Sequence, residues 1–479
     1  MSKFSEYLEQ GIINSGMTEN QLAKISGFTR SYIALMKNGQ RVSKDSEKMK
    51  RLLEALNLSV EEYNIIWNEY IQMRMGKEQY QKTEAVMNFM QNFNQMSNVK
   101  IKAQLQYEIP KKLVLKGHID IEYIIRAMIE KEAMKEQGFV YIMMQPQNSI
   151  SDTFLPGVCK NNGHILIEHI VCLEKSVDTG IENNYLYNIE LLKQLVPTVA
   201  CSAADNYKVY YYYDSIASRT RLGSLLSSMI LTSDHLLCFD STMDNGMLTD
   251  EPESYNMYKK IFEEHKKSCN QMFYHMNMKD CLSSGTYYTG KMLGNICYSI
   301  ATQPCFAVLN AVHMLKNYIK PEYNSYRGIL EMQMLGNQEW IKKEEKKMVS
   351  YCSKNGLIRF AENGEVDEMV PGTYDSPSKI DRKRILKLLI EQIENEKHDL
   401  YLITDETVKL LPELSLVTFS LSNTIVRYQT SNQFSQLLLQ EKSSDKIIFE
   451  AMETLMKNPS VLSLEESLEF VKELYQSLE

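Results

Sequence analysis

One face of a short predicted helix near the start of the chain carries side chains that can recognise another molecule. Arg30, Ser31, Ala34 and Lys37 fall on the same side when they are plotted at 3.6 residues per turn. Arginine, serine and lysine can donate hydrogen bonds. The chemistry predicted for this face is therefore non-covalent binding of acceptor groups.

A first helix is predicted to precede this face and to hold it in place. Thr18 is a good N-cap and Gln21, three residues later, can reach back to it, so a helix is predicted to begin there. Gly27 falls where that helix must stop, because a left-handed backbone suits glycine best. The apolar residues expected on its inner side are Leu22, Ile25 and Phe28, beside the small Ala23.

A second helix is predicted to carry the face itself. Thr29 can cap it, and Asn38-Gly39 can end it. With Ile33 and Met36 turned inward, the four side chains named above point outward. Two short helices at a steep angle, separated by a glycine turn, have the spacing of a helix-turn-helix.

The same region is strongly basic in an acidic chain. From Leu22 to Arg51 the sequence has eight Lys and Arg against Asp45 and Glu47, whereas the whole chain carries a formal charge of −8. A local excess of cations is expected where phosphates are bound. The outward face is thus predicted to enter the major groove of double-stranded DNA.

Residues 1 to about 67 resemble the lambda-repressor-like family of helix-turn-helix domains, also called Cro/repressor or XRE. The residues that carry the resemblance are Thr18, Leu22-Ala23, Gly27, Thr29, Ile33 and Asn38-Gly39. Two further helices complete the five-helix domain that the resemblance implies. One carries Met49, Leu52, Leu53 and Leu56; the other opens at the capping box Ser59-Val60-Glu61-Glu62 and runs through Tyr63, Ile66 and Trp67.

The resemblance also implies which residues contact DNA. Arg30 and Ser31 would read bases, with Ala34 and Lys37 further along the groove. Positions near the sugar-phosphate backbone would be Glu19, Thr29, Tyr32, Asn38 and Gln40. With Arg41 from the basic region, the expected DNA-binding set is Thr29, Arg30, Ser31, Tyr32, Ala34, Lys37, Asn38, Gln40 and Arg41.

Two positions depart from the family pattern. Glu19 stands where an uncharged donor is common, and a carboxylate cannot itself bind phosphate. Lys37 stands where the family often has a carboxylate before Asn-Gly, and residues 1–17 contain no arginine to pair with one. We therefore expect an internal ion pair of the family to be lost as a unit here. The alternative to the whole assignment is an ordinary small helical bundle with a basic patch.

Composition sets the broader class. The 479 residues predict about three domains, and 44% apolar with 24% charged residues is typical of globular proteins. The sequence lacks an apolar run long enough for a membrane helix and a leader for export, so we expect a cytoplasmic protein without membrane contact. The nine scattered cysteines include no CxxC pair and are expected to be reduced thiols, mostly buried.

Residues 68–135 are predicted to form a helical connector that can also serve dimerisation. An apolar stripe at helical spacing runs through Val86, Met90, Phe93 and Val99, with Met87 and Phe89 nearby. The stripe could pack on the body of the chain or on the same helix of a second copy. Because helix-turn-helix domains commonly bind paired half-sites, we expect a homodimer.

The rest of the chain is predicted to be an α/β body, divided into residues 136–345 and 346–479. Helices are expected at 184–195, 253–265, 382–396 and 463–478, between short runs of strand character. The predicted strands are 139–145, 164–173, 207–215, 235–240, 356–362, 399–405, 414–421 and 424–430. Of Tyr210–Tyr213, two are expected on each face of a strand. Arg219 and Arg221 could hold an anion, although a surface pair is favoured.

An internal echo suggests that the body consists of two related lobes. Residues 253–262, ESYNMYKKIF, match residues 466–475, ESLEFVKELY, in order and type, although two unrelated amphipathic helices would match in part. The segment from His235 to His265 also faintly resembles phospholipase-D-like sensor domains of microbial regulators. The HxKxxxxD motif of that class does not occur, so the resemblance implies a fold without hydrolase chemistry.

Two further patterns could belong to an enzyme. Residues 285–292 fit GxxxxGK[ST] except that Met292 supplies no hydroxyl, and His265, Cys269, His275 and Cys281 could bind zinc but lack a standard spacing. We expect neither site to be functional, and hence no catalytic residues, no cofactor and no metal.

The sequence as a whole favours a sequence-specific DNA-binding transcription regulator, dimeric and repressor-like, whose body senses a small-molecule or peptide effector or a partner. One alternative is an enzyme or toxin-system component whose helix-turn-helix controls its own expression. Another is a protein-interaction hub in which the helical head binds protein.

Overall fold

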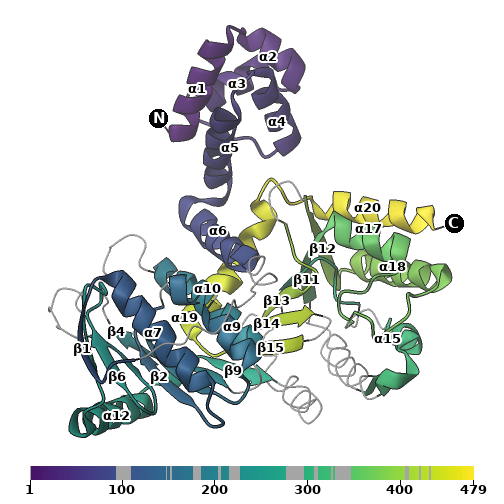
Figure 1. Cartoon of the computed structure of the whole chain (residues 1–479). Coiled ribbons are helices and arrows are strands. Elements are labelled where there is room, and N and C mark those ends of the chain that lie inside the picture. Colours follow the sequence, from purple (N-terminus) through teal and green to yellow (C-terminus); the bar gives the residue numbers. More distant parts are fainter. Residues whose placement is uncertain are drawn as a thin grey trace. The chain divides into compact units, whose positions relative to one another are not determined.

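A computed structural model describes most of the chain (Figure 1). The described residues are 2–92, 109–146, 148–151, 154–175, 185–202, 206–214, 227–276, 296–306, 311–324, 327–328, 347–369, 371–404, 409–419, 422–430 and 433–478. The chain divides into two compact units. The head unit comprises Met1–Glu84 and Glu450–Ser463, and the body unit comprises Ala85–Phe449 and Leu464–Glu479.

Five helices at the start of the head unit form one domain. They are α1 (Lys3–Ser15), α2 (Glu19–Ser26), α3 (Arg30–Lys37), α4 (Ser46–Ala55) and α5 (Val60–Met75). The capping box predicted at Ser59 and Glu62 is present, since each side chain accepts a hydrogen bond from the backbone of the other residue. The predicted inward residues of α4, Met49, Leu52 and Leu53, are fully buried.

Helix α5 extends the domain beyond the predicted end at residue 67. Tyr70 is fully buried, and its hydroxyl donates to the Ser43 carbonyl at 3.1 Å. Ile71 and Met75 belong to the same hydrophobic core. The domain therefore ends near Gly76, whose φ of +87° breaks the helix.

Ile25 is not part of the core, contrary to the prediction. Its side chain is 49% exposed, whereas Leu22 is fully buried and Phe28 packs partly against the core. Helix α2 has only two turns, so its buried face is too narrow to include Ile25 with Leu22 and Ser26.

Helix α6 (Lys77–Asn92) confirms a helix in the connector. In the head unit, the Lys82 ammonium lies 2.5 Å from a Glu78 carboxylate oxygen and 2.7 Å from Glu450. In the body unit, the predicted apolar stripe is buried within the chain, with side chains 1–8% exposed at Val86, Met87, Phe89 and Met90. This part of the stripe is therefore not a free surface for dimerisation, and Phe93 and Val99 lie outside the described residues.

The first lobe of the body is built on an eight-stranded sheet with the order β1-β7-β6-β5-β2-β3-β4-β8. Its strands are β1 (Lys112–Lys116), β2 (Phe139–Met143), β3 (Leu166–Glu174), β4 (Tyr207–Asp214), β5 (Ser228–Leu231), β6 (Leu236–Phe239), β7 (Asn245–Thr249) and β8 (Asn270–Gln271). Its helices are α7 (His118–Ala133), α8 (Asn148–Ser151), α9 (Phe154–Asn161), α10 (Tyr185–Cys201) and α12 (Pro252–Lys267). Phe262 of α12 stacks on Tyr141 of β2, with ring centroids 4.4 Å apart.

The second lobe is built on a seven-stranded sheet with the order β12-β11-β10-β13-β14-β15-β9. Its strands are β9 (Phe273–Met276), β10 (Ile296–Ile300), β11 (Lys347–Ser353), β12 (His398–Ile403), β13 (Leu414–Phe419), β14 (Ser422–Thr430) and β15 (Gln433–Leu439). The α-helices are α15 (Val312–Leu315), α17 (Lys354–Asn363), α18 (Lys379–Glu394), α19 (Lys442–Thr454) and α20 (Leu464–Ser477), and the short 3-10 helices are η3 (Lys316–Tyr318) and η4 (Pro321–Tyr323). The end of α19 and the 3-10 helix η5 (Leu455–Lys457) belong to the head unit.

The two sheets share one pattern of seven strands, to which the first sheet adds β8 beside β4. In each, three consecutive parallel strands (β2-β3-β4 and β10-β11-β12) are continued by three antiparallel strands (β5-β6-β7 and β13-β14-β15) beside the first of them. An antiparallel strand, β1 or β9, closes the end of each series. This supports two related lobes.

The echo between residues 253–262 and 466–475 does not carry the duplication. Helix α12 directly follows β7, whereas α20 is separated from the equivalent strand β15 by α19. The two echo helices thus hold different places in the two lobes.

The boundaries of the lobes also differ from the prediction. Strand β1 and helix α7 lie within residues 68–135 but belong to the first lobe. Strands β9 and β10 lie before residue 345 but join the second sheet, so the change of sheet falls near residue 272. Strand pairing between distant segments sets these limits, and local sequence patterns do not report it.

Most predicted elements of the body are confirmed, but residues 356–362 form a helix and not a strand. The Ser353 side chain accepts the Gly356 amide and starts α17, whose buried residues Leu357, Phe360 and Ala361 have helical spacing. The strand of this region is β11, which begins nine residues earlier, at Lys347. No helix among the described residues combines the length and the apolar content that a membrane crossing requires.

Candidate nucleic-acid interface

The ends of α2 and α3 are fixed by the residues that the sequence predicted. The Thr18 hydroxyl accepts the Gln21 amide at 3.3 Å, and the Gln21 side chain accepts the Thr18 amide at 2.8 Å. Gly27 has a φ of +78°, and the Thr29 hydroxyl accepts the Tyr32 amide at 3.2 Å. The turn and both helices therefore have the predicted limits.

The inward and outward faces of α3 are also as predicted. Ile33 and Met36 are fully buried in the core of the head. Arg30 and Ser31 are exposed at the start of the helix, and Ala34 is half-buried further along. The predicted base-reading side chains thus lie on a surface that a groove can reach.

Arg30 and Lys37 share one carboxylate. The Glu19 side chain lies 3.4 Å from Arg30 Nε and 3.2 Å from Lys37 Nζ. Arg30 is 68% exposed, so its ion pair can exchange readily with another anion. Glu19 therefore holds two of the predicted contact residues in ion pairs within the head.

The ion pair of the family is absent, but Lys37 forms other ion pairs in its place. Lys37 Nζ lies 4.0 Å from Glu9 of α1, in addition to its contact with Glu19 of α2. The lysine of α3 thus meets acidic partners on both neighbouring helices. Its partners lie 28 and 18 residues away in sequence, so their proximity depends on the folded bundle.

The remaining predicted contact residues lie near both ends of α3. Tyr32 stacks on Phe28 with ring centroids 5.3 Å apart and donates to the Val42 carbonyl at 3.3 Å. The Thr29 and Ser31 hydroxyl oxygens are 3.1 Å apart. Three more residues of the set, Asn38, Gln40 and Arg41, are exposed.

Lys48 of α4 lies beside the turn between α2 and α3, although it is not one of the predicted contact residues. Its aliphatic carbons lie near the Gly27 turn, where a Cβ at Gly27 would be 3.5 Å from Lys48 Cε. Its position in the basic stretch from Leu22 to Arg51 was the signal for it in the sequence.

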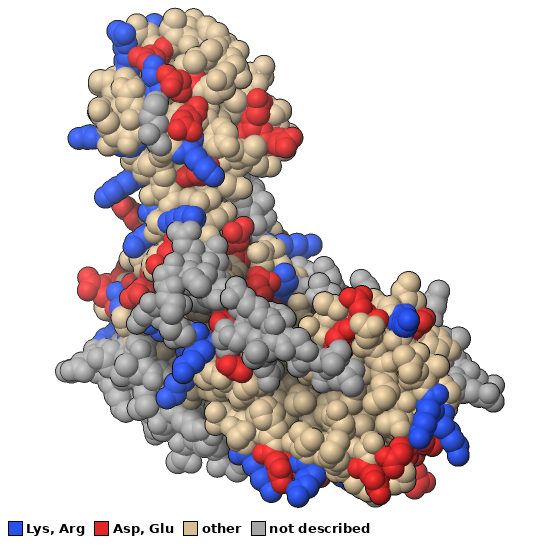
Figure 2. Space-filling model, turned by 90° about the vertical axis from the view of Figure 1, so that its left-hand side faces the viewer, with Lys and Arg blue, Asp and Glu red and all other residues tan. Residues whose placement is uncertain are grey.

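The charges of the head are nearly balanced. Residues 1–75 contain ten Lys and Arg and nine Asp and Glu, and basic and acidic side chains alternate on the visible side of the head (Figure 2).

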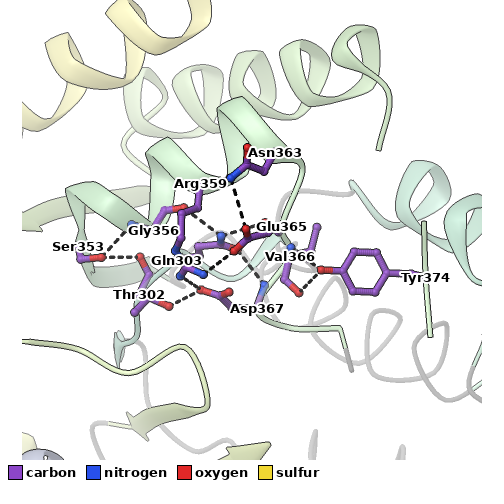
Figure 3. Close-up of polar contacts among 10 residues, drawn as sticks. All are labelled: Thr302, Gln303, Ser353, Gly356, Arg359, Asn363, Glu365, Val366, Asp367 and Tyr374. Carbon is purple, nitrogen blue, oxygen red and sulfur yellow. Dashed lines mark hydrogen bonds and ion pairs between the residues drawn. The ribbon is translucent and has the colours of Figure 1, made fainter. Parts of the chain in front are cut away.

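A second polar cluster lies in the second lobe, where β10 and β11 end (Figure 3). Gln303 donates to the carbonyls of Gly356 and Glu365, both at 2.9 Å, and accepts the Asp367 amide at 3.0 Å. Arg359 of α17 contacts Glu365 at 2.7 Å and Asp367 at 3.0 Å. The carboxyl ends of parallel strands are a common place for ligands in α/β folds.

In this cluster, however, the chain's own groups bind one another. Burial raises the pKa of Asp367, while the Thr302 hydroxyl and the Arg359 guanidinium counteract that rise. A Cβ at Gly356 would lie 1.9 Å from the Thr302 carbonyl oxygen, so only glycine fits there. We interpret the cluster as a structural connection between β10, β11 and α17.

A repeated dipeptide marks equivalent places in the two lobes. Gln145-Pro146 follows β2 and Gln303-Pro304 follows β10. The Gln145 amide donates to the Cys172 carbonyl of β3 at 3.1 Å, as Gln303 donates to a carbonyl beyond β11. This repeated dipeptide is a signal of duplication in the sequence, and it marks equivalent places where the match between residues 253–262 and 466–475 does not.

Two buried histidines lie within the sheets. Burial lowers the pKa of both His169 and His398 to about 4. His169 lies 2.8 Å from the Tyr207 hydroxyl and 3.0 Å from the Met144 carbonyl, and His398 lies 2.8 Å from the Ser350 hydroxyl. Both rings are neutral near pH 7 and serve the packing of the sheets.

The candidate zinc ligands are distributed over different elements. His265 lies at the end of α12 and touches Tyr212, whereas His275 of β9 lies 3.1 Å from Ser435 in the second sheet. The Cys269 thiol donates to the His265 carbonyl. Within the described part of the chain, no three His, Cys, Asp or Glu side chains are grouped to hold a metal ion.

Several predictions fall outside the described residues: Cys281, the loop at 285–292, and Arg219 with Arg221. Among the described residues, the predicted alternation of tyrosines on β4 is confirmed. Tyr210 and Tyr212 face α12, whereas the Tyr213 hydroxyl donates to Glu441. The free cysteines among the described residues are mostly buried.

Comparison with protein families identifies the head. Residues 8–63 match the family model described as Helix-turn-helix. The N-terminal domain is thus a helix-turn-helix domain of the lambda-repressor-like type. A search of curated proteins gives no match.

The solved structures that align with the chain are distant. TrmBL2, described as an archaeal chromatin protein with a novel mode of DNA binding, is 11% identical over 44% of this chain and 70% of its own, with a TM-score of 0.22. A polyphosphate kinase from Porphyromonas gingivalis is 9% identical over 77% and 56% (TM-score 0.21), and a phosphatidylserine synthase from Haemophilus influenzae is 9% identical over 81% and 95% (TM-score 0.21).

Proposed function

We propose that the protein is a sequence-specific transcription regulator that reads DNA with α3. The observation that carries this proposal is the exposure of Arg30 and Ser31 at the start of a helix whose other face is fully buried at Ile33 and Met36. Residues at the start of a recognition helix are those that reach base edges.

The regulator acts as a homodimer in this proposal. Each copy places one α3 in a major groove, and the two half-sites lie about one helical turn apart. Because α6 already buries part of its apolar stripe within the chain, the dimer contact must involve other surfaces. Measuring the mass of the protein alone and on a duplex with two half-sites tests this arrangement.

The body serves regulation rather than catalysis in this proposal. Two inferred features support it: the absence of the HxKxxxxD motif from the sequence, and the burial of His169 and His398 in neutral form. An effector or partner that binds the body would then change the affinity of the dimer for DNA through its different affinity for two states. Catalytic turnover by the purified full-length protein would contradict this part of the proposal. So would nucleotide or zinc that is bound to the purified protein in stoichiometric amount.

Fluorescence-anisotropy titrations test DNA reading directly. The intact protein is titrated against duplexes from a genomic-fragment library, at a fixed salt concentration, beside Arg30→Ala and Lys77→Ala. Lys77 is an exposed cation at the start of α6 and serves as the control. We expect Arg30→Ala to lose the preference for the best fragment while Lys77→Ala keeps it. Equal binding to all fragments by the intact protein would refute the proposal.

A further inference from the structure

A groove between α18 and α20 in the body unit combines a row of cations with a small apolar floor. It has a volume of about 280 Å³. It is lined by Lys379, Ile380, Lys383, Arg384, Lys387, Tyr475 and Leu478. No part of the DNA-reading head contributes to it.

The cations form a row along one helix. Lys379, Lys383 and Lys387 recur every four residues on α18, so each lies about 6 Å further along the axis and the row spans about 12 Å. Between residues 379 and 387 there are five Lys and Arg but one acid, Asp381. Such a row matches an anion that repeats along a line better than it matches a single small anion.

The first of these cations lies where a basic side chain is unfavourable for the helix itself. Lys379 opens α18, where the helix macrodipole is positive and acidic side chains are preferred, and Lys383 and Lys387 follow in the second and third turns. The macrodipole and the side chains therefore add to one positive potential at the groove. Basic side chains at this place lower the stability of the helix, and a groove that binds a polyanion would explain why they are present.

Two of the basic side chains, Arg384 and Lys387, form exposed ion pairs within the helix. Arg384 lies 3.2 Å from Asp381 and Lys387 lies 3.9 Å from Glu391, and both basic side chains are more than 60% exposed. The Lys383 ammonium lies 4.9 Å from the centre of the Tyr475 ring. Exposed ion pairs contribute little, so a phosphate can take their place at low cost.

We propose that this groove is a second DNA-binding site, which holds phosphates of duplex DNA outside the segment read by α3. The inference rests on the proposed function, because the head tethers the body to any duplex that it binds. The contact is independent of base sequence, since lysines bind phosphates without reading bases.

The test compares two triple variants of the full chain that each remove three positive charges. Lys379→Gln/Lys383→Gln/Lys387→Gln changes the groove. The control, Lys193→Gln/Lys260→Gln/Lys267→Gln, changes three lysines of α10 and α12. Binding to a 60-bp duplex is measured between 50 and 200 mM salt, because each phosphate contact contributes about 0.9 to the slope of log affinity against log salt.

We expect the groove variant to lower this slope by about 2 to 3 relative to the control and to keep the same preferred sequence. Equal slopes for the two variants would overturn the inference. A second outcome would also overturn it: the groove variant loses binding to vesicles of phosphatidylglycerol and phosphatidylcholine while its binding to DNA is unchanged. That result would assign the groove to a lipid surface.

The same measurements separate this inference from the proposed function. The slope is also measured with Arg30→Ala present in both triple variants and with a duplex of unrelated sequence. If the intact chain shows no sequence preference but the slopes still differ, the proposed function fails and the groove remains a DNA site. If preference is intact and the slopes agree, only the groove inference fails.

Discussion

Replacing Glu19 by glutamine should weaken the fold of the head while strengthening its binding to DNA. The carboxylate pairs with Arg30 at 3.4 Å and with Lys37 at 3.2 Å, and it lies in the first turn of α2. Partly exposed ion pairs are worth up to about 1 kcal/mol each, and an acidic residue at a helix start adds about 0.3–1 kcal/mol. We expect the free energy of unfolding to fall by about 1–1.5 kcal/mol in Glu19→Gln.

The gain in DNA affinity has the same origin. Without the carboxylate, Arg30 and Lys37 no longer have to break an ion pair with Glu19 before they bind DNA. The repulsion between Glu19 and the DNA phosphates also disappears. A change of about 1 kcal/mol corresponds to roughly fivefold tighter binding. Glutamine also supplies an uncharged donor, which can add to the gain.

Urea unfolding and fluorescence anisotropy measure the two effects separately. A Trp340→Phe background leaves Trp67, which is 7% exposed in the head core, as the only tryptophan and a reporter of head unfolding. The matched control is Glu47→Gln, since Glu47 also lies in a first helical turn and pairs with Lys50 at 3.4 Å. If Glu19→Gln bound DNA no more tightly than the control, the competition between Glu19 and phosphate would be disproved.

Three further predictions concern the rest of the chain. Glu450→Gln should lower the stability of the head unit by about 1–2 kcal/mol in urea unfolding, because Lys82 is only 9% exposed and loses one of its two carboxylates. Gly356→Ala should destabilise the second lobe by more than about 2 kcal/mol in calorimetry, since the added Cβ would meet the Thr302 carbonyl. Stability should fall as the pH decreases from about 6.5 to 4, because an unfolded histidine binds a proton that buried His398 does not, and His398→Gln should reduce that slope by about 1.4 kcal/mol per pH unit.

Each of these changes has a matched control. Glu264→Gln removes one partner of an exposed pair with Lys260 and should leave stability unchanged. Gly328→Ala adds a methyl group where no atom lies within 4 Å. His118→Gln removes an exposed histidine and serves as the control for the loss of an imidazole. A control as damaging as its test variant would contradict the corresponding argument.

The head was predictable because its signals are local. Thr18, Gly27 and Thr29 set helix ends through contacts within four residues, so sequence spacing alone was sufficient. The pairing of Lys37 with Glu9 and Glu19 was missed because it depends on how three helices pack. The sequence identified the residues of the face but not the electrostatic competition within it.

The body was predictable only in its class. Short apolar runs such as residues 399–405 and 414–421 predicted strands correctly, but the run at 356–362 belongs to a helix that Ser353 caps. The assignment of β9 to the second sheet follows from pairing with β15, more than 150 residues later. Periodicity within a window carries no information about such partners.

The measurement that tests the central claim most directly is selection from a random duplex pool by the intact chain, followed by the same selection with Arg30→Ala. Arginine at the start of a recognition helix contributes about 1–3 kcal/mol of discrimination at one base pair. We predict a defined motif for the intact chain and relaxed preference at one position of each half-site in the variant, with the other positions kept. An identical motif for both proteins, or no motif for the intact chain, would contradict the assignment of α3 as the reading helix.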